Sequence, residues 1–151
     1  MDIDTLIGRL NAAHADGHPE LIQKAAIMEL SQKLRDDDLP KLLQPLTKAH
    51  WENAAQVLKL IGFPRIKRIE DGLVRWLRDI NWPGARTVRT ILLTLRDEEF
   101  VPLISRNLLL ALSENDLDWL EPLQSLIEEK RVGEKFSTDL QSIIRSTDRN
   151  V

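Results

Sequence analysis

Apolar residues recur along most of the chain at intervals of three and four, the spacing that places them on one face of an α-helix. The segment after Pro64 shows this clearly, with Ile66, Ile69, Leu73 and Leu77 separated by polar positions. Apolar and polar residues never alternate over the length of a strand, and leucine far outnumbers the β-branched residues. The pattern therefore predicts an all-α protein of about eight or nine helices.

The prolines are regularly spaced. From Pro45 onward, the steps to Pro64, Pro83, Pro102 and Pro122 are 19, 19, 19 and 20 residues. Proline is tolerated in the first turn of a helix and is costly further in. The spacing therefore predicts that these five prolines mark the starts of successive helices, each of three to four turns.

A longer repeat overlies this spacing. The pattern Trp-x-x-Ala-x-x-Val begins at Trp51 and again at Trp82, 31 residues later, and Trp119-x-x-Pro122 repeats it loosely after another 37 residues. Two proline steps make 38 residues, so the repeating unit is a pair of helices. We expect a short HEAT-like α-solenoid of antiparallel helix pairs, in which each pair buries a face against the next. An irregular helical bundle is the alternative.

The segment Trp-Leu-Arg-Asp-Ile-Asn-Trp-Pro-Gly-Ala-Arg has the chemistry of a corner between two helices. The first helix is expected to end near Arg78. Asp79 or Asn81 would then accept hydrogen bonds from the free N–H groups of the next helix, with Pro83 in its first turn. Trp82 is expected to fold back over this corner. The residues assigned to the structural corner are Trp76, Asp79, Asn81, Trp82 and Pro83.

The same segment resembles the signature of a bacterial helical family that carries only the label domain of unknown function 5071. The resemblance extends from about Leu39 to Glu129 and includes Asp116-x-x-Trp119. It implies a HEAT-like fold and no established activity. Two departures are Arg78, where family members usually have glutamine, and Gly84, where they usually have valine.

The expected organisation is therefore a single helical repeat domain over residues 1–151. Within it, residues 1–38 form N-terminal helices outside the resemblance and residues 39–129 form the family-like core. Residues 130–151 form a C-terminal capping helix.

Charge is unevenly distributed. Residues 1–58, 59–96 and 97–151 carry net charges of −3, +6 and −6, within a chain of 151 residues whose net charge is −3. A basic block thus lies between acidic ends. The candidate partner-binding residues form two expected rows on successive helices, Arg65, Arg68 and Arg75 on the first and Arg86, Arg89 and Arg96 on the second.

The alternative is that these arginines form a solvated face and pair with acidic neighbours such as Glu70, Asp79 or Asp97. Arg86 beside Asp79 is the clearest example of such a structural pairing.

No motif in the chain indicates catalysis, a cofactor or a metal. The sequence contains no cysteine, so thiolate sites are excluded. His14 and His18 are four residues apart but flank a glycine-containing turn, and we interpret them as solvated loop residues rather than metal ligands. His50 is interpreted as a helix flank, and the acidic run from Asp36 to Asp38 as a solvated linker rather than a cation site.

The segment Met1-Asp2-Ile3-Asp4 is acidic where a secretory signal needs positive charge, and the longest apolar run, from Leu108 to Leu112, is too short to span a bilayer. We therefore expect a soluble, cytoplasmic protein.

Three hypotheses about function follow from these features. The first is a non-enzymatic module that binds another protein, for example a toxin-neutralising immunity protein with a cognate toxin as partner. The second is a HEAT-like nucleic-acid-binding protein that uses the central arginines, although the net acidic charge opposes this. The third is an enzyme with an unrecognised site. The sequence favours the first and leaves the oligomeric state open.

Overall fold

The computed structural model describes residues 1–12 and 17–148. Within these ranges the chain forms α-helices and short 3-10 helices, and it contains no strand, so the all-α prediction is confirmed. The α-helices are α1 (Ile3–Gly8), α2 (Pro19–Lys33), α3 (Lys48–Ile61), α4 (Glu70–Trp76), α5 (Ala85–Leu92), α6 (Asp97–Ser113), α7 (Leu117–Lys130) and α8 (Thr138–Asp148). The 3-10 helices are η1 (Asp36–Leu42), η2 (Arg65–Ile69) and η3 (Gly133–Lys135).

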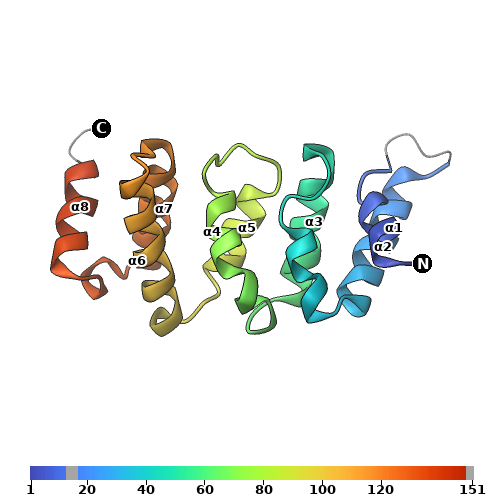
Figure 1. Ribbon diagram of the computed structural model, residues 1–151, viewed down its shortest axis with the longest axis horizontal. Coiled ribbons are helices and arrows are strands. Elements are labelled where there is room, and N and C mark those ends of the chain that lie inside the picture. Colours follow the sequence, from blue (N-terminus) through green and yellow to red (C-terminus); the bar gives the residue numbers. More distant parts are fainter. Residues whose placement is uncertain (13–16, 149–151) are drawn as a thin grey trace.

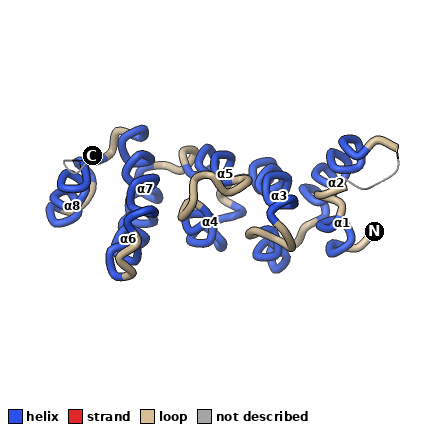
Figure 2. The backbone as a smooth tube through the Cα atoms, turned by 90° about the horizontal axis from the view of Figure 1, so that it is seen from above, coloured by secondary structure: helices blue, strands red, loops and turns tan. Residues whose placement is uncertain are grey.

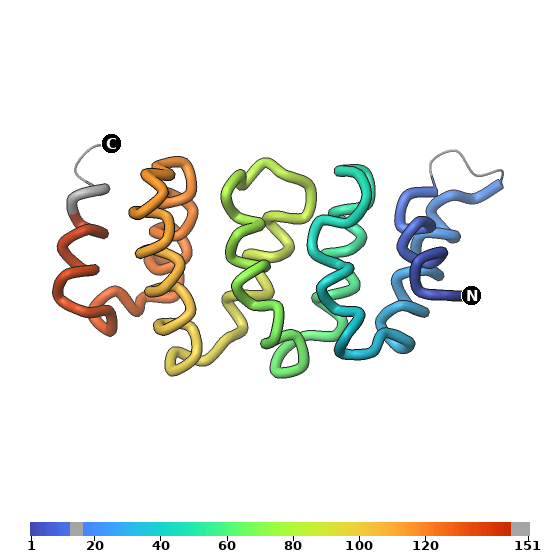
Figure 3. The backbone as a smooth tube through the Cα atoms, viewed as in Figure 1, coloured from blue at the N-terminus to red at the C-terminus, as the bar shows by residue number. Residues whose placement is uncertain are grey.

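The helices stand side by side in one row that follows the order of the chain, so its two ends lie at opposite ends of the row (Figure 1, Figure 3). In the view from above, α4 lies below α5 in the picture, and α6 lies below α7 (Figure 2). Helix α3 packs against α5 in one layer, and α4 packs against α6 in the other. The row is therefore built from helix pairs in two layers.

Several side-chain hydrogen bonds join neighbouring pairs at sequence separations of 31 to 38 residues. In the α3/α5 layer, the Thr87 hydroxyl donates to Glu52, 35 residues away. In the α4/α6 layer, the Arg106 guanidinium donates to Asp71, also 35 residues away. The equal offset indicates that successive pairs stack in the same register, with a repeat length inside the range expected from the tryptophans and prolines. Assignment to the HEAT class and to a solenoid stays a prediction.

One hydrophobic core runs the length of the row, from Leu6 in α1 to Leu140 in α8. Its largest fully buried side chains are Trp76, Trp119 and Phe100. Because each pair covers the apolar face of its neighbour, burial continues from pair to pair without a break.

The prediction that the spaced prolines begin helices is wrong for Pro102 and Pro122, each of which lies inside its helix. Helix α6 begins at Asp97, where three acidic residues in the first turn complement the positive end of the helix dipole. Helix α7 is fixed by Asp116, whose carboxylate accepts a hydrogen bond from the Trp119 backbone N–H at 3.1 Å. The acidic first turn of α6 and the Asp116 cap of α7 therefore outweigh the loss of the one backbone hydrogen bond that each proline cannot donate.

The other three spaced prolines precede helices instead of lying in their first turns. Pro45 and Pro83 belong to the loops before α3 and α5, and Pro64 is the N-cap of η2. Two short helices, η2 and α4, replace the single helix expected after Pro64. Helix α5 has 8 residues, about two turns instead of three to four.

Asp36 and Asp37 are exposed, as expected for a solvated segment, but the run forms the start of η1 instead of an irregular linker. The Asp36 carboxylate lies 3.0 Å from the Arg65 guanidinium, and that of Asp37 lies 3.3 Å from the Arg68 guanidinium. The acidic run thus packs η1 against η2 through opposite charges.

Candidate functional site

Residues 77–84 form the loop that joins α4 to α5, and its geometry differs from the expected cap. The Asp79 carboxylate accepts a hydrogen bond from the Asn81 backbone N–H at 2.8 Å, which shapes a turn within the loop. The N-cap of α5 is Gly84, and no side chain caps this helix. The prediction that Asp79 or Asn81 caps α5 is therefore wrong. The loop continues past both residues, and α5 begins only at Ala85.

Gly84 is required by two features of this corner. Its backbone has φ of +87°, in the left-handed region that side chains disfavour. A Cβ atom at this position would lie 2.7 Å from the Trp76 ring and 2.9 Å from the Trp51 carbonyl oxygen. Helices α4 and α5 can approach α3 this closely only because the residue between them has no side chain.

Three tryptophans pack together around this glycine. The ring of Trp51, from α3, lies edge-on to Trp76 with centroids 6.4 Å apart and edge-on to Trp82 with centroids 5.8 Å apart. The indole N–H of Trp51 donates to the Pro45 carbonyl at 3.0 Å, and that of Trp76 donates to the Pro83 carbonyl at 3.0 Å. Trp82 thus packs against a residue of α3.

Trp82 differs from the other tryptophans. The indole N–H of Trp119 donates to the Val74 carbonyl at 3.1 Å, so Trp51, Trp76 and Trp119 all have satisfied donors. The indole N–H of Trp82 has no hydrogen-bond partner within residues 1–12 and 17–148, and its side chain is only half-buried.

A cleft of about 290 Å³ opens beside Trp82, between α3 and the α4–α5 loop. We call it the corner cleft, and its lining residues are Glu52, Ile80, Asn81, Trp82, Pro83, Gly84 and Arg86.

The Glu52 carboxylate in this cleft is held by hydrogen bonds from the Thr87 hydroxyl at 3.0 and 3.1 Å and from the Gln56 amide at 3.4 Å. Arg86 is exposed, and among the described residues no carboxylate lies within 4 Å of its guanidinium. The expected pairing of Arg86 with Asp79 therefore does not form. The cleft combines a fixed carboxylate with a guanidinium that has no ion-pair partner in the described chain.

The remaining predicted arginines do not form two rows on two helices. Arg65 and Arg68 lie on η2, Arg75 on α4, and Arg96 is the N-cap of α6 rather than part of α5. The second row is therefore limited to Arg86 and Arg89.

Most of these arginines contact carboxylates of the same chain. Besides the pairs at η1, Arg89 pairs with Glu129 and lies 3.3 Å from the Ser125 hydroxyl, and Arg96 lies 3.8 Å from Glu99. Arg75, like Arg86, has no ion pair in the part of the chain that the structure describes. Among the described residues, a ligand could therefore reach Arg75 or Arg86 without breaking an ion pair of the chain, whereas the other four arginines are paired.

Sequence reasoning missed an arginine that pairs with two carboxylates at once. Arg106 of α6 places its guanidinium 2.8 Å from both Glu70 and Asp71 of α4. The guanidinium holds the pKa of the Asp71 carboxyl below its ordinary value, and Asp71 in turn raises the pKa of Arg106. A separation of 35 residues, one repeat length, is the signal in the sequence that could have found it.

Arg78, a departure from the family pattern, also has a structural role. Its guanidinium lies 4.8 Å from the centre of the Trp119 ring and pairs with Glu114. Its contact with Asp116 is longer, at 3.8 Å. The arginine thus ties the end of α4 to the start of α7.

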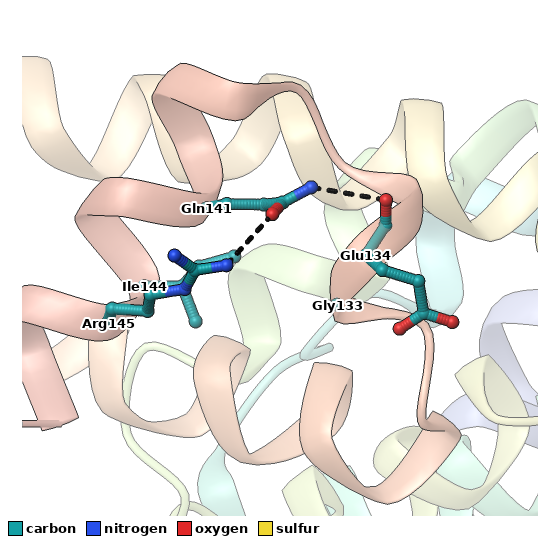
Figure 4. A pocket seen from close by; sticks show the side chains of 5 residues that line it. All are labelled: Gly133, Glu134, Gln141, Ile144 and Arg145. Carbon is teal, nitrogen blue, oxygen red and sulfur yellow. Dashed lines mark hydrogen bonds between the residues drawn. The ribbon is translucent and has the colours of Figure 1, made fainter.

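A second pocket, also of about 290 Å³, lies between η3 and α8 (Figure 4). The Gln141 amide in this pocket is already used. The Gln141 amide donates to the carbonyls of Glu134 at 3.1 Å and Phe136 at 2.8 Å, and its oxygen accepts from Arg145 at 3.2 Å. These hydrogen bonds fasten α8 to η3, so we assign this pocket to packing of the last helix.

The histidines have local roles where they are described. His50 is buried in the first turn of α3, with Nδ1 2.8 Å from the Thr47 hydroxyl, and so stabilises the start of that helix. His18 is the exposed N-cap of α2, and His14 lies outside the described residues. Across residues 1–12 and 17–148, no group of three or more potential metal ligands is present.

None of the described helices combines the length and apolar character needed to cross a membrane.

Together the fold and the corner cleft define an all-α protein of stacked helix pairs with a conspicuous tryptophan–proline–glycine corner. The chain belongs to the family described as Domain of unknown function (DUF5071), which it matches over residues 43–149. The expected membership is confirmed, and the match begins slightly later than expected and continues through α8 instead of ending near residue 129. Neither the curated proteins nor the solved structures include a significant match to this chain.

Proposed function

We propose that the chain is a non-enzymatic protein-binding module and that its partner contacts the corner cleft. The observation that carries this proposal is that a half-buried Trp82 and an exposed Arg86 line the same cleft. Arg86 has no ion-pair partner among the described residues. Tryptophan and arginine dominate the binding energy of many protein interfaces, because both combine a large contact area with directed hydrogen bonds. The cleft lies inside the segment that matches the family.

The shape of the fold supports the same proposal. A row of helix pairs exposes long faces made of side chains from successive helices, and such faces suit the binding of a second folded protein. Next to the corner cleft, Glu52 and Thr87 join α3 to α5 and fix the two helices relative to each other. A partner would therefore meet a preformed surface, which lowers the entropic cost of binding.

A more specific form of this proposal is a toxin-neutralising immunity protein that acts in the cytoplasm of a bacterium. It is supported by analogy, because such proteins are often small, acidic and non-enzymatic, and this chain has 151 residues and a net charge of −3. An adjacent toxin-like reading frame would supply the candidate partner. Co-purification of the two proteins at a fixed ratio would support this form, and failure to bind would overturn it.

The general proposal is tested by capturing partners from the native host with the purified chain, identifying the dominant one and measuring its affinity for variants. Arg86→Glu is expected to weaken binding at least tenfold, because it replaces the contact cation with an anion. The matched control is Arg75→Glu, an equal charge reversal at the other arginine without an ion pair, and it should retain binding. Circular dichroism would verify that both variants stay folded.

The proposal fails if no partner rises above background. It also fails if a captured partner binds the Arg86→Glu variant as tightly as the original chain.

The nucleic-acid alternative receives less support. Arg65, Arg68 and Arg89 face carboxylates of the same chain, so a phosphate would have to compete with these groups for each guanidinium. Phosphate-based binding falls steeply as salt rises, so this alternative expects retention on DNA or RNA at about 50 mM salt that is lost near 200 mM. Absence of retention at the lower concentration would remove it.

A further inference from the structure

The corner cleft presents hydrogen-bond donors that the described chain leaves without acceptors. The Trp82 indole N–H and the Arg86 guanidinium are both in this state, and both residues line the same cleft. Elsewhere in the described chain, the indole N–H of Trp51, Trp76 and Trp119 each meets a backbone carbonyl. Unsatisfied donors beside an open cleft favour a ligand that brings acceptors.

Glu52 restricts which acceptor fits. Its carboxylate lines the same cleft and is held in place by the Thr87 hydroxyl and the Gln56 amide. A phosphate group carries a charge of about −1.5 to −2 and would be repelled by this fixed anion. A carboxylate carries half that charge or little more and is planar, so it can accept two parallel hydrogen bonds from a guanidinium.

We propose that the corner cleft recognises a carboxylate side chain, aspartate or glutamate, which the partner protein presents next to a hydrogen-bond donor. The carboxylate accepts from the Arg86 guanidinium and the Trp82 indole N–H, and the neighbouring donor meets Glu52. This inference rests on the proposed function and adds the chemistry of the recognised group. It distinguishes an acidic peptide from a phosphorylated one and from nucleic acid.

The geometry gives each residue a separate task. Arg86 supplies the charge that attracts the acidic side chain, and Trp82 supplies a second donor on a ring that is held edge-on to Trp51. Glu52 selects the residue beside the acid and rejects more highly charged groups. Gly84 allows the backbone that lines the cleft to lie close to Trp76 and Trp51, because a Cβ atom there would meet both residues.

The experiment titrates the ¹⁵N-labelled chain with three short peptides, acetylated at the N-terminus and amidated at the C-terminus, that differ at one position: Glu-Gly-Lys, Gln-Gly-Lys and phosphoserine-Gly-Lys. The readouts are the indole N–H resonance of Trp82 and the backbone amide resonance of Gly84. We expect Glu-Gly-Lys to shift both resonances with a dissociation constant in the millimolar range, as is usual for a single small contact. The Gln and phosphoserine peptides should bind at least fivefold more weakly.

Variants assign the contacts, with Gly84 as the common readout. Arg86→Gln should weaken the Glu-Gly-Lys peptide about tenfold or more, the usual loss for a charged hydrogen-bond partner. Trp82→Phe keeps the ring but removes the donor and should weaken binding a fewfold. Glu52→Gln should reduce the difference in affinity between the Glu and phosphoserine peptides. Arg75→Gln is the matched control and should leave all three affinities unchanged.

The inference is overturned if the Glu and Gln peptides bind equally, if the phosphoserine peptide binds most tightly, or if no peptide shifts either resonance at about 10 mM. None of these peptide results contradicts the proposed function if the Arg86→Glu variant still binds a captured partner protein more weakly than the original chain does. If the captured partner binds both equally, the proposed function itself fails. The two failures can therefore be told apart.

Discussion

Arg106 and Arg86 lie on successive helices of the second half of the fold, yet their surroundings differ completely. The guanidinium of Arg106 is 2.8 Å from two carboxylates of α4, those of Glu70 and Asp71. Arg86 shares a cleft with Glu52, but the Glu52 carboxylate is held by Thr87 and no ion pair forms within 4 Å. One arginine is used to join helix pairs, and the other is available to a ligand.

This comparison extends to the layers in which the two arginines lie. In the α4/α6 layer, charges of opposite sign meet one repeat apart, as Arg106 and Asp71 do, and η1 and η2 are joined in the same way. At the corner between α4 and α5, aromatic rings and a glycine provide the close packing, so the nearby charged groups are not needed for it. Residues of the same type therefore join helix pairs in one region and have no ion-pair partner among the described residues in the other.

The largest expected effect is at the corner glycine. Gly84→Ala places a Cβ atom 2.7 Å from Trp76 at φ of +87° and should destabilise the fold by about 2–4 kcal/mol, measured by chemical denaturation. Gly8→Ala is the control, because a Cβ atom there would meet nothing within 4 Å apart from its chain neighbours and the backbone of its own helix, and it should be neutral or slightly stabilising. Equal stability of the two variants would show that the corner tolerates a side chain.

The second effect separates the two arginines. Arg106→Ala removes the partner of Glu70, whose side chain is only 11% exposed, and should cost about 1–3 kcal/mol of unfolding free energy. Arg86→Ala should change the unfolding free energy by no more than about 0.5 kcal/mol. Denaturation of both variants under the same conditions checks this contrast, and a similar loss in both would mean that Arg86 also has a structural role.

Acid should weaken the α4/α6 layer. The pKa of Asp71 is lowered in the folded chain, chiefly by its hydrogen bond with Arg106, so its contribution is complete above the ordinary value near 3.8. That contribution is lost as the pH falls through the lower folded pKa. The unfolding free energy should therefore fall less steeply below about pH 4 in Asp71→Asn than in the original chain.

The comparison of variants is needed because Asp2 and Asp97 also have lowered pKa values, Asp2 through the Thr5 backbone N–H and Asp97 through Lys135. Asp37→Asn, at an almost fully exposed carboxylate, serves as the control. Identical pH profiles for Asp71→Asn and the original chain would exclude Asp71 as a source of the acid sensitivity.

The smallest effect is expected at the exposed ion pair between η1 and η2. Arg68→Ala removes a contact with Asp37, whose side chain is 98% exposed, and should cost about 0.5 kcal/mol or less. Addition of salt should reduce even this difference, because exposed charges are screened. A loss above about 1 kcal/mol would place this pair with Arg106 rather than among the weak surface contacts.

Much of the fold could be predicted from helical periodicity, because the apolar stripe of each segment records which face is buried. The stripe of Ile66, Ile69, Leu73 and Leu77, which the sequence analysis singled out, is buried in the core. The predicted helix starts at Pro102 and Pro122 are wrong. The acidic first turn of α6 and the Asp116 cap of α7 act locally and set the start of each helix before its proline. A regular spacing of one residue type was a weaker guide than the caps.

The candidate site could be predicted only in part. The corner segment and Arg86 stood out in the sequence, and the structure places both at one cleft. Glu52 was not singled out, since nothing in the local pattern connects it with a loop 30 residues away. Conversely, the sequence could not show which arginines are paired, because Asp36 and Arg65 meet only when η1 packs on η2.

By itself, the sequence determined the helical character of the chain, its division into pairs, its family and the position of its corner. These properties follow from local periodicity and from short motifs whose residues act within one or two turns. Only the tertiary structure decided that Arg106 is paired and that Arg86 has no ion-pair partner among the described residues, because each outcome depends on which carboxylates a neighbouring helix pair brings close. The net charge of the basic block was visible in the sequence, but the availability of each charge depended on packing.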